Sequence, residues 1–143
     1  MKSKKRLPLY ILSFLFYGSI LFLTLHAWDI RCAGLPQVTV GRLEKEEFSY
    51  TVTNQAGQTF EATYDFFAIP KELAAHGRFF EIETVRKEKF TYYYAKEISI
   101  PIDKTKENET SYALFQTNFR KTIILTGYET LEDGMEVHLI QEE

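Results

Sequence analysis

The chain has little of what stabilises or activates many small proteins. One of its 143 residues is a cysteine, so no intramolecular disulfide can form. Seven glycines and four prolines argue against a disordered or low-complexity sequence. The sequence has no cysteine or histidine cluster at metal spacing, no glycine-rich phosphate loop and no nucleophile elbow. We therefore predict no metal, no cofactor and no catalytic residue, and we expect stability to come from apolar burial.

Charge is unevenly distributed along the chain. Four of the 17 basic residues precede residue 7 and none of the 20 acidic residues does, so the remainder carries a formal charge of −7. A domain of that sign is repelled by phosphate backbones, which predicts no nucleic-acid partner and favours a cationic or neutral one. The alternative is an acidic surface that only keeps the domain soluble.

The longest apolar run covers residues 7–28 and contains no Asp, Glu, Lys or Arg. A helix of this length crosses the roughly 30 Å hydrocarbon layer of a bilayer. With the basic prefix 1–6 before it, the run predicts a transmembrane signal anchor, with the prefix in the cytoplasm and the remaining chain outside. The predicted localisation is thus the cell membrane, with a single span and the membrane itself as a partner. The alternative is cleavage near Ala27 and secretion.

Residues 29–37 combine Gly34 and Pro36 with charges and predict a linker. Nine flexible residues give a tether of roughly 15–18 Å, which would hold an extracytoplasmic domain of residues 38–143 close to the membrane. Cys32 in this segment is expected to be an inert thiol, with an intermolecular bridge as the alternative.

The domain after the linker shows the two-residue period of β-strands. Residues 48–53 and 60–66 predict a hairpin whose three-residue loop ends at Gly57 in the left-handed conformation. In that register Val52 faces Phe60, and the apolar residues of both strands share one face of the sheet.

Residues 78–85 and 89–100 predict a second hairpin, in which Val85 pairs with Phe90. One face carries mainly apolar side chains and is the expected core. The other face brings rings and charges together in a composition that suits a peptide strand, a glycan or a protein anchor residue. The alternative is that the helix or the C-terminal hairpin covers the tyrosines of this face. The candidate binding surface consists of Tyr92, Tyr94, Glu81, Glu83 and Lys96.

The remaining segments complete a small β-domain. Residues 68–77 predict one short helix closed by Gly77, residues 103–110 predict a polar loop, and residues 112–115, 120–126 and 135–139 predict strands. The order of a meander, a helix and a hairpin over residues 38–100 resembles OB-type barrels, with residues 120–141 as an additional hairpin. The predicted fold class is mainly β, an N-terminal transmembrane helix followed by a small antiparallel β-barrel or sheet domain.

Two functional hypotheses follow from these features. The first is a membrane-anchored, non-catalytic binding or accessory subunit with a protein partner near the membrane surface. The second is a small exported enzyme that uses carboxylates for acid/base chemistry on wall or peptide substrates. Its candidate pairs are Glu81 with Glu83 and Glu46 with Glu47.

Overall fold

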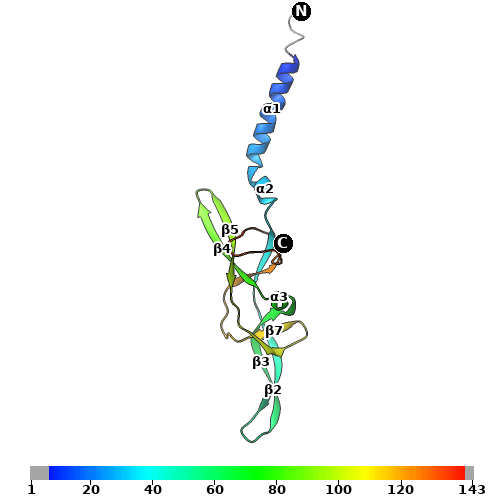
Figure 1. Ribbon diagram of the computed structural model, residues 1–143, viewed down its shortest axis with the longest axis vertical. Coiled ribbons are helices and arrows are strands. Elements are labelled where there is room, and N and C mark those ends of the chain that lie inside the picture. Colours follow the sequence, from blue (N-terminus) through cyan, green and yellow to red (C-terminus); the bar gives the residue numbers. More distant parts are fainter. Residues whose placement is uncertain (1–6, 141–143) are drawn as a thin grey trace, which may run out of the picture. The chain divides into compact units, whose positions relative to one another are not determined.

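The computed structural model describes residues 7–140, and the chain divides into two compact units, Met1–Leu35 and Pro36–Glu143 (Figure 1). The basic prefix predicted for residues 1–6 lies outside the described residues. The first unit contains helices α1 (Leu7–Leu25) and α2 (Ala27–Cys32). The segment predicted as a linker, residues 29–37, therefore contains most of α2 and the first residue of the following strand.

The continuous helix predicted for residues 7–28 does not form. The helix α1 has 19 residues and ends at Leu25, because His26 leaves the helical conformation with φ −105° and ψ 10°. Within residues 7–140 no helix is both long and apolar enough to cross a membrane.

This finding corrects several predictions that shared one premise. The transmembrane signal anchor, the membrane as a partner and the single-pass localisation are wrong. The placement of the β-domain outside the cell as an anchored domain rested on the same segment. Cleavage near Ala27 and secretion stays a prediction. The mainly β character of the rest of the chain does not depend on it.

The second unit is built from strands and one short helix. Their bounds within residues 36–140 are β1 (Gln37–Arg42), β2 (Lys45–Thr53), β3 (Thr59–Pro70), α3 (Lys71–His76), β4 (Phe79–Lys87), β5 (Phe90–Ile98), β6 (Ile102–Glu107), β7 (Ser111–Leu114), β8 (Thr122–Thr126) and β9 (Glu136–Leu139).

Five of these strands close a barrel in the order β1-β8-β4-β5-β9. The strand β1 pairs antiparallel with β8 and parallel with β9, which joins the two ends of the sheet. Inward-facing side chains fill the interior, because alternate residues of a strand point to opposite faces. The buried residues of this core are Val38, Phe80, Ala95, Ile124, Leu131 and Val137.

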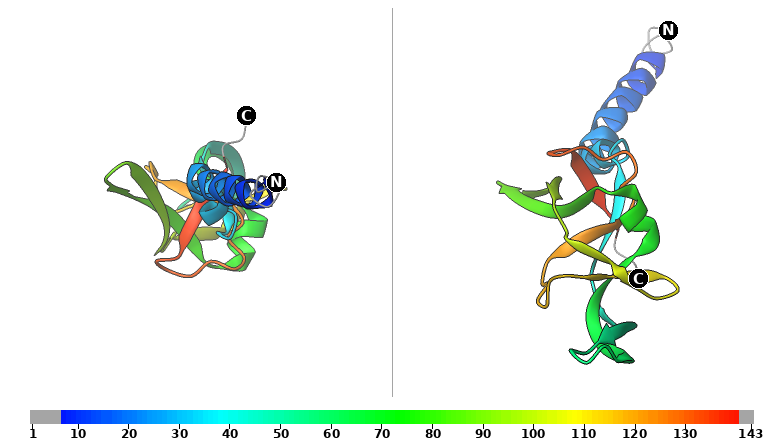
Figure 2. Two further views of the ribbon diagram at one scale, coloured as in Figure 1. Left: turned by 90° about the horizontal axis from the view of Figure 1, so that it is seen from above. Right: turned by 60° about the horizontal axis from the view of Figure 1, so that its bottom comes forward.

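The other four strands form a sheet in the order β2-β3-β7-β6, and α3 lies beside it (Figures 1 and 2). The helix buries Leu73 and Ala74 and ends at Gly77, which takes the predicted left-handed conformation with φ 79°. A second core forms from buried side chains of both sheets and of α3. Its buried members are Leu43, Ile69, Leu73, Ala74, Phe79, Ile100, Leu114, Phe119 and Ile123.

The expected OB-type order is wrong. A meander requires β1 to pair with β2, but β1 pairs with β8 and β9 while β2 pairs with β3. The chain crosses from the barrel to the four-stranded sheet at Leu43, which is buried in the second core and holds the crossing in place. The predicted C-terminal hairpin is also wrong, because β8 and β9 each pair with other strands of the barrel.

The two long hairpins test the predicted registers. The first is confirmed: Val52 pairs with Phe60, and Gly57 has φ 78°. The second is shifted by two residues, with Val85 opposite Tyr92, because the strands continue to a tight turn at Glu88, whose φ is 53°. A shift of two residues leaves every side chain on its predicted face.

The polar segment 103–110 is a strand over much of its length, contrary to the prediction. Asp103 pairs with Ala113 of β7, and Glu107 pairs with Tyr112. The ladder between these two points is irregular, which fits its polar composition.

Candidate functional site

The structure places the five residues of the predicted surface on one face of the β4–β5 hairpin. Glu83 pairs with Tyr94 and Glu81 with Lys96, while Tyr92 lies two positions nearer the turn. Both tyrosines are half-buried, and neither belongs to the two large cores. The opposite face, with Phe80 and Ala95, fills the barrel as predicted.

Ion pairs compensate part of the charge on this face. The Glu81 carboxylate lies 2.8 Å from Lys121 Nζ and 3.8 Å from Lys96 Nζ. Lys87 Nζ lies 6.0 Å from the ring centroid of Tyr92. Lysines thus already contact two members of the predicted surface, Glu81 and Tyr92.

A more exposed aromatic surface lies on the β2–β3 hairpin. Phe60 and Tyr64 of β3 are large aromatic residues and are 52% and 59% exposed. Tyr50 lies between Tyr64 and Phe66, with ring centroids 6.0 and 6.1 Å apart. Phe48 and Glu46 lie on this side of the hairpin too, nearer its base. We call the outer side chains on this side the aromatic face; they are Tyr50, Val52, Phe60, Ala62, Tyr64 and Phe66.

The exposure follows from how the hairpin is paired. Only Ala68–Pro70 at the end of β3 pair with β7, so the rest of the hairpin has no third strand beside β3 within residues 36–140. Figure 1 and the right view of Figure 2 show the turn end extending away from β7. Large exposed apolar patches of this kind mark interaction sites in soluble domains.

A buried charge pair supports the base of the aromatic face. Lys106 Nζ lies 5.0 Å from the ring centroid of Tyr50 and 5.3 Å from that of Phe66, and it bonds to the Asp103 carboxylate. Asp103 also accepts bonds from the backbone N–H and the hydroxyl of Thr105, at 3.1 and 2.5 Å. Burial raises the pKa of Asp103, but the bonds from Lys106 and Thr105 outweigh it and lower the pKa.

The other side of the hairpin is acidic and polar. Glu47 stands directly opposite Asp65, and Glu61 lies further toward the turn opposite Thr51. All three acidic side chains are exposed. Like charges that face each other across strands repel, so this side favours a cationic neighbour.

A polar pocket of about 510 Å³ lies between β2 and β6. Three consecutive residues of each strand line it, and consecutive side chains point to opposite faces of a strand. The pocket is therefore bounded by the edges of two strands and not by one face of the sheet. Its lining residues are Ser49, Tyr50, Thr51, Thr105, Lys106 and Glu107.

Members of both carboxylate pairs of the enzyme hypothesis already contact other side chains. Glu46 and Glu47 are neighbours in β2, so their side chains lie on opposite faces. Glu46 accepts bonds from Asn108 Nδ2 at 2.6 Å and Ser111 Oγ at 3.3 Å, and Glu81 binds lysines. Carboxylate catalysis stays a prediction that none of these contacts favours. The described residues also contain no group of three His, Cys, Asp or Glu side chains arranged to hold a metal.

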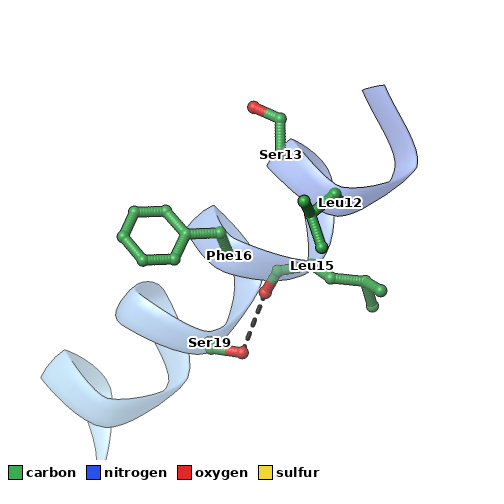
Figure 3. Close-up of a pocket in the computed structure, with 5 residues that line it drawn as sticks. All are labelled: Leu12, Ser13, Leu15, Phe16 and Ser19. Atoms are coloured by element: carbon green, nitrogen blue, oxygen red, sulfur yellow. Dashed lines mark hydrogen bonds between the residues drawn. The ribbon is translucent and has the colours of Figure 1, made fainter. Parts of the chain in front are cut away.

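A further pocket lies on α1 and is shown in Figure 3. One helix supplies all of its lining side chains, and Ser19 donates its hydroxyl hydrogen bond to the Leu15 carbonyl at 2.8 Å. Since that bond is internal to the helix, the pocket offers few polar groups for a ligand. The lining residues are Leu12, Ser13, Leu15, Phe16 and Ser19.

Two other titratable groups lie outside the hairpins' surfaces. His76 at the end of α3 contacts Tyr128 edge-on, with centroids 5.0 Å apart, and its buried Nδ1 has no hydrogen-bond partner in the described chain. Burial, assisted by the charges of Glu129 and Glu72, raises the pKa of Tyr128. Both rings pack as parts of the structure around α3.

Sequence reasoning did not single out the aromatic face as a site. The alternating apolar pattern correctly predicts that its rings lie on one side of the hairpin. The pattern does not indicate whether other residues pack over them. The available signal was the mismatch between the long hairpin and the short strands predicted after it, such as residues 112–115. A short neighbour cannot pair along all of a long strand.

Comparison with known proteins adds no identification. No family description, no curated protein and no solved structure matches this chain at a significant level. The site alone therefore carries the functional argument.

Proposed function

We propose that residues 36–143 form a non-catalytic binding domain that holds a partner protein on the aromatic face of the β2–β3 hairpin. The observation that carries this proposal is the exposure of Phe60 and Tyr64, 52% and 59%, beside Tyr50. Tyrosine and phenylalanine give large contact area at low conformational cost and dominate the energetic centres of interfaces.

The structure of the hairpin suits binding better than internal packing. Its base is anchored by Phe48, which is buried with Ala68 and Ala113, whereas its outer half is exposed. Folding therefore does not depend on the exposed rings, and their apolar area remains for a partner to bury.

The test is photo-crosslinking from position 64 in the cells that make the protein, with identification of the crosslinked protein. We expect one protein to be crosslinked from position 64 and lost in the Phe60→Ser, Tyr64→Ser double variant. Phe115 is 65% exposed but lies outside the aromatic face, so crosslinking from position 115 and the Phe115→Ser variant are matched controls.

Two results would contradict the proposal. One is the same crosslinked protein from positions 64 and 115, and the other is undiminished crosslinking in the double variant. The thermal stability of the double variant is measured in parallel, and we expect little change because both rings are more than half exposed.

The outer face of β4–β5 is a second candidate surface for the same binding function. Tyr92 and Tyr94 lie there with Glu81, Glu83 and Lys96. Replacing both tyrosines with serine distinguishes the roles: lost stability indicates packing, whereas retained stability with lost crosslinking indicates binding.

A further inference from the structure

The edge of β2 that faces the pocket carries backbone groups whose direction follows from the hairpin register. The N–H of Asn54 donates to the Gln58 carbonyl at 2.9 Å, which makes this the hydrogen-bonded pair next to the turn. In antiparallel strands hydrogen-bonded and non-hydrogen-bonded pairs alternate. Counting back from the turn, the pairs of Thr51 with Glu61 and of Ser49 with Thr63 are non-hydrogen-bonded.

The N–H and C=O groups of Ser49 and Thr51 therefore point away from β3. The strand β2 is the end strand of its sheet, so they point to an unpaired edge. Both residues line the pocket between β2 and β6. Exposed edges of this kind template the addition of another strand.

We propose that an extended segment of the partner protein adds to this edge as an antiparallel strand beside Ser49–Thr51. The proposal rests on the binding function above and names how the partner is held. Main-chain hydrogen bonds to Ser49 and Thr51 supply the pairing, and alternate side chains of the segment contact the two sides of the hairpin.

The two sides of the hairpin define the chemistry of that segment. Side chains on the side of Tyr50 meet the aromatic face and are apolar. Those on the other side lie near Glu47, which already faces Asp65, and are basic. That side of β2 and β3 holds one basic residue, Lys45, against three acidic ones, so charge complementarity favours basic side chains there. The segment alternates Lys or Arg with apolar residues.

The probe is a synthetic eight-residue peptide of alternating lysine and valine, added to the full chain. We expect it to slow hydrogen exchange of the Ser49 and Thr51 amides at least tenfold and to leave Thr63 unchanged. A peptide with glutamate in place of lysine should bind at least tenfold more weakly. In the antiparallel arrangement the lysines stand opposite Ser49 and Thr51, so N-methylation of the lysines should abolish protection, whereas N-methylation of the valines should preserve it.

A matched pair of variants tests the edge in the protein itself. Ser49→Pro and Thr63→Pro each remove one outward N–H and the same 3.2 Å hydroxyl contact, but on opposite edges of the hairpin. We expect only Ser49→Pro to abolish peptide binding. The N-methylated peptides act on the unaltered chain, so the test stands even if a proline variant does not fold.

Strand addition is contradicted if the amides of Ser49 and Thr51 are already protected without peptide, or if the protein self-associates through this edge. It is also contradicted if the peptide with N-methylated lysines still binds, or if both proline variants lose peptide binding equally. Loss of crosslinking in the Phe60 and Tyr64 double variant together with retained binding in Ser49→Pro would reject strand addition and leave the proposed function standing.

Discussion

The hairpins β2–β3 and β4–β5 are similar in composition but differ in how their aromatic residues are buried. Both pair over nine positions and both are rich in aromatic residues. The second forms part of the barrel wall, where β8 pairs with β4 at Glu81 and β9 pairs with β5 at Tyr93 and Tyr94, and its inner face is core. The first has β7 beside only its last residues, and its aromatic face stays exposed. Closure of the barrel over one face, not the alternation, makes that face core.

The largest expected effect comes from truncating one ring on each hairpin. Phe80 is 1% exposed inside the barrel, so Phe80→Ala should lower the free energy of unfolding by about 3–5 kcal/mol. The matched variant Phe60→Ala should lose less than about 1 kcal/mol, because that ring is half exposed. Urea unfolding measures both. Similar losses of unfolding free energy in the two variants would show that the aromatic face is also core. The two hairpins would then not differ in this respect.

A smaller difference in stability is expected between alanine substitutions at two glycines, Gly127 after β8 and Gly57 in the β2–β3 turn. Gly127 has φ 76°, and a Cβ there would lie 2.1 Å from the Gln37 carbonyl oxygen at the start of β1. Gly127→Ala should cost roughly 2–3 kcal/mol, since strain adds to a backbone clash. Gly57 has nearly the same φ but open space around it, so Gly57→Ala should cost about 1 kcal/mol. Equal thermal shifts would mean that backbone conformation alone sets the cost.

Local features of the fold were predictable and distant ones were not. The turn at Gly57 was found because a left-handed glycine and the apolar alternation agree on one register. The β4–β5 turn was misplaced by two residues because a non-glycine residue, Glu88, takes the positive φ there. The pairing of β1 with β8 joins residues more than 80 positions apart, such as Thr39 and Thr126, and no local pattern encodes it.

The candidate site was predicted in part. The five residues of the β4–β5 surface do share one face, because alternation is local. The aromatic face was missed as a surface, since local alternation does not indicate whether other residues pack over a face. Lys106 and Asp103 lay in a segment predicted as a loop, so their support of Tyr50 and Phe66 had no sequence signal.

The smallest expected effect is on the pH dependence of stability and concerns the junction of the aromatic face with its sheet. The pKa of Asp103 is lowered in the folded chain, because the bonds from Lys106 and Thr105 outweigh burial. A lowered folded-state pKa contributes stability that is fully present above the unfolded value of about 3.9 and is lost as pH falls through the folded value. The free energy of unfolding should therefore decline below about pH 4, and Asp103→Asn should make this decline shallower.

Urea unfolding between about pH 2 and pH 4 measures the slope of stability against pH in the unaltered chain and in Asp103→Asn. Hydrogen exchange at Tyr50 and Phe66 measured across that range locates the effect. If protonation of Asp103 releases Lys106 from the two rings, their amides should lose protection before those of the barrel core around Phe80. Simultaneous loss in both regions would instead show that the hairpin base and the barrel unfold as one unit, and that the contrast between them is one of exposure alone.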